Sequence, residues 1–145
     1  MKIVQLTPYY PPCKGGIARA VGGWSKYIGT TEDLCVISQK GEPSEGVSIL
    51  DLGKGRFITK SLGLLRKFDP EVVHCHSHWH ILAPAVVHKR LCKRTRIVFT
   101  FHTEPPSPIR GVKRKVFESL LSKCDAITYV SKALKDRINR EVTIK

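Results

Sequence analysis

Histidine is the residue type in this chain that most directly suggests chemistry, and His102 occupies the most informative position. It follows a run at residues 97–99 whose β-branched and aromatic side chains are typical of a strand buried on both faces. Thr103, Glu104 and two prolines come next, so the imidazole lies where the predicted strand ends. Open α/β sheets bind their ligands at this end of their strands. His102 is therefore a candidate ligand-binding residue, although a loop histidine that meets only water fits the position equally well.

Four further histidines stand at alternate positions, which places them on one face wherever the chain is extended. They are His74, His76, His78 and His80. Imidazole is a ligand of zinc, iron and manganese, so a metal-dependent hydrolase built on this cluster is one alternative function. The helical pattern of residues 79–92, however, predicts a turn near Ser77 that separates the four side chains. We therefore favour contact of His76 and His78 with a polar ligand, and we expect no metal.

Two adjacent glycines form a second candidate site. Gly15 and Gly16 stand between a predicted strand at residues 2–6 and a helical pattern that reaches Ile28. Glycine lets the backbone approach a ligand closely, and the free amides in the first turn of a helix favour a phosphate. The segment matches neither the GxGxxG dinucleotide fingerprint nor a P-loop. A tight turn without a ligand is the competing explanation.

The chain is strongly basic, with 25 Lys and Arg residues against 12 Asp and Glu residues and a formal net charge of +13. Four cations gather where a helix over residues 111–123 is predicted to begin, namely Arg110, Lys113, Arg114 and Lys115. Cations at a helix N-terminus oppose its dipole, so the cluster suggests contact with an anionic surface. A solvated helix face is the simpler explanation. A non-enzymatic polyanion-binding domain is the other alternative function.

Strand and helix patterns alternate along the whole chain and predict how these residues are positioned. Strands are predicted at residues 2–6, 34–38, 47–52, 71–76, 95–101 and 125–130, and helices at 17–28, 56–68, 79–92, 111–123 and 132–140. This order predicts a single-domain α/β fold, with a doubly wound, mostly parallel Rossmann-like sheet of about six or seven strands and helices on both faces. Ser131 is a candidate N-cap of the last helix. The glycine pair, the strand-end histidines and Ser131 should then converge on one crevice.

Composition places the chain among globular proteins. It has 145 residues, of which 41% are hydrophobic and 26% charged, and no apolar run approaches the ~20 residues needed to cross a bilayer. Its five cysteines are odd in number, widely spaced and without a CxxC pair. These features favour a reducing, cytoplasmic setting and argue against disulfides or a structural zinc knot.

Four stretches of the chain, YYPPCKGGIARAV, DPEVVHCHSHW, IVFTFHTEP and CDAITYVSKAL, together resemble the N-terminal domain of GT-B glycosyltransferases of the retaining family four. The resemblance implies transfer of a sugar from a nucleotide-sugar to a sugar or lipid-linked acceptor, with no divalent metal and no other cofactor. It also implies that residues 1–145 are the acceptor-side Rossmann-like domain, that the C-terminal donor domain is absent, and that the chain alone is inactive.

The same resemblance implies roles for individual residues. Gly15 and Gly16 would approach the donor phosphates and sugar, and His102 would be the catalytic residue that hydrogen bonds the transferred sugar. The acceptor side would be lined by His76, His78, Thr103, Glu104 and Ser131. The basic helix would dock on an anionic membrane surface, which makes the expected location cytoplasmic and peripheral to the membrane. No specific nucleic acid is expected as a partner.

Overall fold

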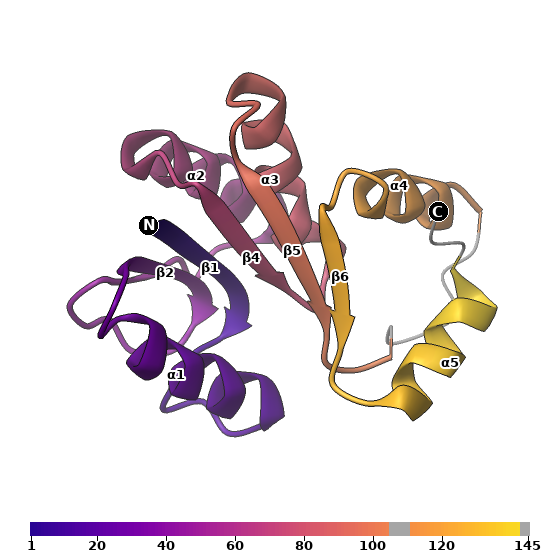
Figure 1. Ribbon diagram of the computed structural model, residues 1–145, viewed down its shortest axis with the longest axis horizontal. Helices are drawn as coiled ribbons and strands as arrows, with labels where there is room; N and C mark the ends of the chain where they lie inside the picture. Colours follow the sequence, from indigo (N-terminus) through magenta and orange to yellow (C-terminus); the bar gives the residue numbers. More distant parts are fainter. Residues whose placement is uncertain (105–110, 143–145) are drawn as a thin grey trace.

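The computed structural model describes residues 1–104 and 111–142, which form one six-stranded sheet with helices packed around it (Figure 1). Every strand pairing is parallel, and the strand order is β3-β2-β1-β4-β5-β6. The strands are β1 (Lys2–Tyr9), β2 (Asp33–Lys40), β3 (Val47–Ile49), β4 (Val72–His76), β5 (Arg96–Phe101) and β6 (Ala126–Tyr129). The helices are α1 (Gly16–Ile28), α2 (Lys54–Phe68), α3 (Trp79–Leu91), α4 (Gly111–Leu121) and α5 (Lys132–Glu141). The predicted α/β fold with a parallel Rossmann-like sheet is confirmed.

The face of the sheet under α2, α3 and α4 is the apolar core (Figure 1). Val4, Val73 and Phe99 are completely buried there, and Phe57 of α2 and Phe117 of α4 belong to the same cluster. Removal of this apolar surface from water is the main force that holds the helices against the sheet.

The face under α1, which we call the α1 face, buries polar side chains beside apolar ones such as Ile3 and Val36. Side chains alternate along a strand, so when Val73 and Cys75 of β4 enter the apolar core, His74 and His76 must enter the α1 face. Gln5 of β1 is paired in register with His74 and is also completely buried. A row of polar groups is therefore covered by α1, close to where the strands end.

The predicted and observed strand boundaries differ mainly in β1 and β3. β1 continues to Tyr9 rather than ending at residue 6, because β2 extends equally far and pairs its Lys40 with Tyr9. β3 is shorter than predicted, since only residues 47–49 have a partner in β2. The predicted N-cap is confirmed, with the Ser131 hydroxyl oxygen accepting a hydrogen bond from the Leu134 amide at 3.1 Å.

Candidate functional site

Three histidines pack against one another on the α1 face, and we call His74, His76 and His102 the imidazole layer. The rings of His74 and His76 have centroids 4.2 Å apart, and those of His76 and His102 are 5.2 Å apart. The sheet explains this, because β4 and β5 pair in parallel with His76 beside Thr100, so His102 follows at the same edge. The layer thus joins a strand-end histidine to two histidines of the neighbouring strand.

Trp24 of α1 covers the imidazole layer. Its ring stacks on His74 with centroids 5.4 Å apart and an interplanar angle of 18°, and it lies 5.6 Å from His76 and 5.8 Å from His102. Below it, Nε2 of His74 lies 2.7 Å from the Thr100 hydroxyl. The helix therefore holds the three imidazoles between an indole ring and the sheet, which fixes their orientation.

The hydrogen bond between His76 and His102 indicates how His102 is protonated. Nδ1 of His76 lies 3.1 Å from Nε2 of His102, whereas Nε2 of His76 is buried and has no partner among the described residues. A buried N–H without an acceptor is rarer than an unused acceptor, so we assign the proton of His76 to Nδ1. His76 then donates to Nε2 of His102. The neutral His102 ring carries its own proton on Nδ1, the nitrogen left for a ligand.

Burial keeps the imidazole layer uncharged near neutral pH. Burial, assisted by the neighbouring His102, lowers the pKa of His74 from 6.5 to about 4. The pKa of His76 falls well below its ordinary value of 6.5, mainly through burial and then through His74 and His102. Burial also lowers the pKa of His102. The layer therefore offers neutral hydrogen-bonding groups instead of a positive charge.

His102 and the glycine pair line the same cavity. This first cavity has a volume of about 430 Å³, and its walls include Lys14, Gly15, Gly16, His102 and Thr103. Gly15 has a φ of 128°, a conformation that other residues rarely adopt, and a Cβ added at either glycine would meet no atom within 4 Å. The backbone amides at the start of α1 therefore border the same cavity as the imidazole of His102.

A second cavity of about 390 Å³ adjoins the first and shares His102 and Thr103 with it. Its walls also include Glu104, Ser131 and Arg137. Glu104 forms an ion pair with Arg137, and the Ser131 hydroxyl already caps α5. Of the predicted acceptor-side residues, Thr103, Glu104 and Ser131 therefore lie together, although two of them already have protein partners.

His76 and His78 lie elsewhere. His76 is completely buried beneath His102 and lines neither of the two cavities. The chain turns at Ser77, whose φ is 68°, so His78 and His80 stack on each other beyond the strand. His80 contacts Phe57 of α2, on the apolar-core side of the sheet. The turn expected near Ser77 is therefore observed, and the histidines at positions 74–80 separate into two pairs.

Comparison with known proteins identifies the family. The profile of Glycosyltransferase Family 4 matches residues 48–145. The chain belongs to Glycosyltransferase Family 4. The resemblance predicted from the sequence stretches is thereby confirmed. Of the expected donor-side, catalytic and acceptor-side residues, all except Gly15 and Gly16 lie inside the matched region. No curated protein matches this family 4 chain.

Solved structures of other proteins share the fold of this Family 4 chain. One is from Listeria monocytogenes, was determined at 2.2 Å resolution and is assigned as a UDP-N-acetylglucosamine 2-epimerase. The similarity has a TM-score of 0.50 with 9% sequence identity, and it covers 97% of this chain and 42% of that one. The Family 4 chain therefore spans less than half the length of that relative. This degree of likeness identifies the fold alone.

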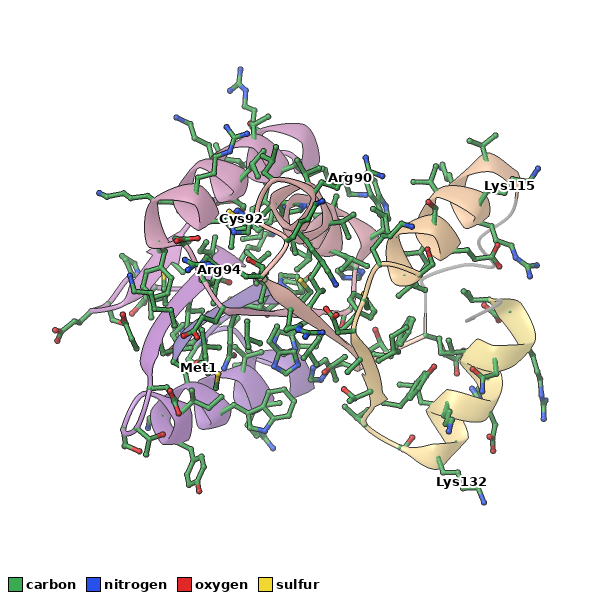
Figure 2. The ribbon with its side chains drawn as sticks, turned by 45° about the horizontal axis from the view of Figure 1, so that its top comes forward. Met1, Arg90, Cys92, Arg94, Lys115 and Lys132 are labelled. Atoms are coloured by element: carbon green, nitrogen blue, oxygen red, sulfur yellow. The ribbon has the colours of Figure 1, made fainter. Side chains whose placement is uncertain are left out.

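The predicted basic cluster lies on α4 of the Family 4 domain, apart from the two cavities. Lys113 and Lys115 are exposed, and Figure 2 shows Lys115 on the outer side of the helix. Nε of Arg114 lies 2.9 Å from Oε1 of Glu118, so this cation already has an acidic neighbour. Arg110 lies outside the described residues. Within the described part of the chain, none of the helices has both the length and the apolarity that a membrane crossing requires.

The sequence reasoning missed several residues that shape the site of this Family 4 domain. Trp24 lies at an apolar position of the helical pattern that ends at Ile28, yet its ring stacks on His74. Gln5 and Thr100 are polar residues inside apolar strand patterns. The sequence reveals this contrast, but it does not indicate which role the two side chains have. Lys14 precedes the glycine pair directly and lines the first cavity.

Proposed function

We propose that this chain is the acceptor-binding half of a retaining glycosyltransferase that moves a sugar from a nucleotide-sugar to a sugar or lipid-linked acceptor. One observation carries the proposal, namely that Gly15, Gly16 and His102 line one cavity at the end of a parallel sheet. Family 4 membership supports the reaction class. The retaining stereochemistry and the identity of the acceptor come from the sequence resemblance.

The donor phosphates would lie at the start of α1. The first amides of a helix lack intrahelical acceptors and carry the positive end of its dipole, so they stabilise a negative charge. No acidic residue occupies the first turn of α1, and Lys14 adds a cation at the cavity wall. These groups would neutralise charge that develops on the leaving diphosphate, which is why the proposal assigns no divalent metal to transfer.

His102 would contact the transferred sugar. With its proton on Nδ1, the neutral ring donates a hydrogen bond to a sugar oxygen, and His76 orients that ring from behind. A neutral donor suits a transition state in which positive charge develops on the sugar, because an imidazolium would repel that charge. His102 is thus proposed as a catalytic residue and His76 as a positioning residue.

The acceptor would approach through the second cavity, next to Thr103. Thr103 lines both cavities, so this residue would lie between the proposed donor and acceptor positions. Glu104 and Arg137, joined as an ion pair, would hydrogen bond polar groups of the acceptor without placing an unpaired charge in the site. The nucleotide base would be held by a donor domain outside residues 1–145, so we expect residues 1–145 alone to be inactive.

The deciding experiment replaces His102 in a protein that joins this chain to its donor domain. His102→Ala is expected to lower kcat at least a hundredfold while the circular dichroism spectrum is unchanged. His80→Gln is the matched control, because His80 is a buried histidine that contacts Gln39 and Phe57 instead of the first cavity. Wild-type turnover by His102→Ala would remove His102 from the mechanism. Sugar transfer by the isolated 145-residue chain would contradict the proposed division between two domains.

The outer side of α4 supports a second proposal, which is peripheral docking on an anionic membrane. Val112 and Val116 are exposed by 77% and 47%, one helical turn apart, and the exposed Lys113 and Lys115 flank them. Apolar side chains beside cations are the combination that binds the surface of an anionic bilayer. Co-sedimentation with anionic vesicles should fall when Lys113, Arg114 and Lys115 are changed to Gln. Unchanged co-sedimentation would refute the docking.

A further inference from the structure

A second cluster of chemically competent side chains lies away from the cavities, at the other edge of the sheet. Asp69 caps the C-terminus of α2 shortly before β4, and His88 and Cys92 lie at the end of α3 shortly before β5. The cluster therefore lies where the strands begin, whereas His102 lies where they end. Figure 2 labels Cys92 and Arg94 close together in this region.

The ligand atoms of these three residues converge. One atom from each of Asp69, His88 and Cys92 lies within 4.8 Å of the other two, and within the described residues this is the one such group of His, Cys and acidic side chains. Sγ of Cys92 is already 3.8 Å from Oδ1 of Asp69. Cys92 caps the C-terminus of α3 four positions after His88, and its amide donates a hydrogen bond to the His88 carbonyl, so the last turn of the helix holds the two residues together.

His88 provides an independent indication that a ligand is missing from its surroundings. Its side chain is completely buried, and neither ring nitrogen has a hydrogen-bond partner in the described structure. A buried imidazole with both nitrogens unpaired costs free energy, and native proteins rarely leave such a group without a partner. A metal ion bound by one ring nitrogen would remove the part of that cost that belongs to that nitrogen.

From this geometry we propose that Asp69, His88 and Cys92 form a zinc site. Thiolate, imidazole and carboxylate are all established ligands of Zn²⁺, while Mg²⁺ and Ca²⁺ favour oxygen ligands and avoid sulfur. Tetrahedral coordination at ordinary Zn–S, Zn–N and Zn–O lengths needs ligand atoms about 3.3–3.6 Å apart. The Cys92 Sγ to Asp69 Oδ1 distance of 3.8 Å is close to that separation, and the other separations of up to 4.8 Å would have to shorten when the ion binds, with water in the fourth position.

Charge and helix geometry fit a cation here. The Cys92 thiol loses its proton to solvent when its sulfur bonds the metal, so one thiolate and one carboxylate neutralise Zn²⁺. The C-termini of α2 and α3 both lie beside the cluster. The negative ends of the two helix dipoles favour a positive ion there. Arg94, paired with Oδ2 of Asp69, leaves Oδ1 to face the metal. The ion would tie the ends of α2 and α3 together.

Calorimetric titration of the chain, produced without a histidine tag, with Zn²⁺ alone tests the proposal. One Zn²⁺ per chain is expected, and Cys92→Ser or Asp69→Asn should each weaken binding at least tenfold. Cys124→Ser is the matched control, since Cys124 is also a half-buried cysteine but bonds the Leu120 carbonyl. The absence of Zn²⁺ binding, or unchanged binding by Cys92→Ser, would overturn the site.

A second measurement on the unaltered chain covers the case in which the variants do not fold. Zn²⁺ should slow the alkylation of Cys92 by a maleimide, with the modified residue identified by mass spectrometry, and should leave the rate at Cys13 unchanged. Replacement of Zn²⁺ by Co²⁺ should add a thiolate-to-metal absorption band. Equal alkylation of Cys92 with and without Zn²⁺, or protection of Cys13 instead, would show that the cluster does not bind the metal.

Discussion

Acid should destabilise this domain through its imidazole layer, and His74 gives the clearest case. Burial lowers the pKa of His74 from 6.5 to about 4, so between these values the unfolded chain binds a proton that the folded chain does not. Stability therefore falls as the pH falls through this window, and the loss is complete below the folded pKa. From about pH 7 to about pH 4.5, this one residue should remove about 2.5 kcal/mol of the free energy of unfolding.

Urea denaturation at a series of pH values, followed by fluorescence, measures this loss. Trp24 stacks on His74, so its emission reports on the relevant part of the structure. His74→Gln keeps a group that can hydrogen bond Thr100 but cannot titrate, and it should lose about 2 kcal/mol less than wild type over the same interval. Ser25→Ala, a non-titrating change on the same helix as Trp24, should follow the wild-type pH dependence. Parallel curves for His74→Gln and wild type would refute the assignment.

Three further changes have definite expected outcomes. Gly16→Ala should fold with stability within about 1 kcal/mol of wild type. In a protein that joins this chain to the proposed donor domain, it should lower kcat/KM for the proposed nucleotide-sugar at least tenfold, whereas Gly23→Ala on the same helix should leave kcat/KM unchanged. Gly41→Ala should cost more than about 1 kcal/mol by urea denaturation, because φ is 144° and the added Cβ would lie 2.8 Å from the Tyr10 carbonyl oxygen. Asp125→Asn should lower the free energy of unfolding by about 1–2 kcal/mol and the melting temperature by several degrees. The reason is that the carboxylate accepts hydrogen bonds from Lys89 and from the Ile97 amide.

Much of the fold follows from local patterns because each buried strand is a short, nearly uninterrupted apolar run. The end of β5 and the position of His102 were predictable, since the run stops where the sheet stops. The cap at Ser131 and the turn at Ser77 were predictable for the same local reason. Strand lengths were harder to predict, because the length of β1 depends on its pairing with β2, and no local sequence pattern contains that pairing.

The site was harder to predict, because its contacts join distant segments. The meeting of Trp24 with His74 depends on how α1 crosses the sheet, and helical periodicity alone assigned Trp24 to an apolar position. The Asp69, His88 and Cys92 cluster was missed for a similar reason. Asp69 is distant in the sequence and meets the other two residues only in the folded domain, whereas sequence spacing could connect only His88 to Cys92, at the end of one helix.

The order of strands in the sheet has a consequence for how the chain acquires its structure. β1 is synthesised first but occupies an inner position, and one of its two partners is β4, with Ile3 beside Val72. Until β4 leaves the ribosome, one edge of β1 has open amides and carbonyls, and closing that gap costs the entropy of a long loop. The pairing of β1 must therefore wait until His76 at the end of β4 has been synthesised. Nascent fragments that end before β4 are then the species most exposed to aggregation or to chaperone capture.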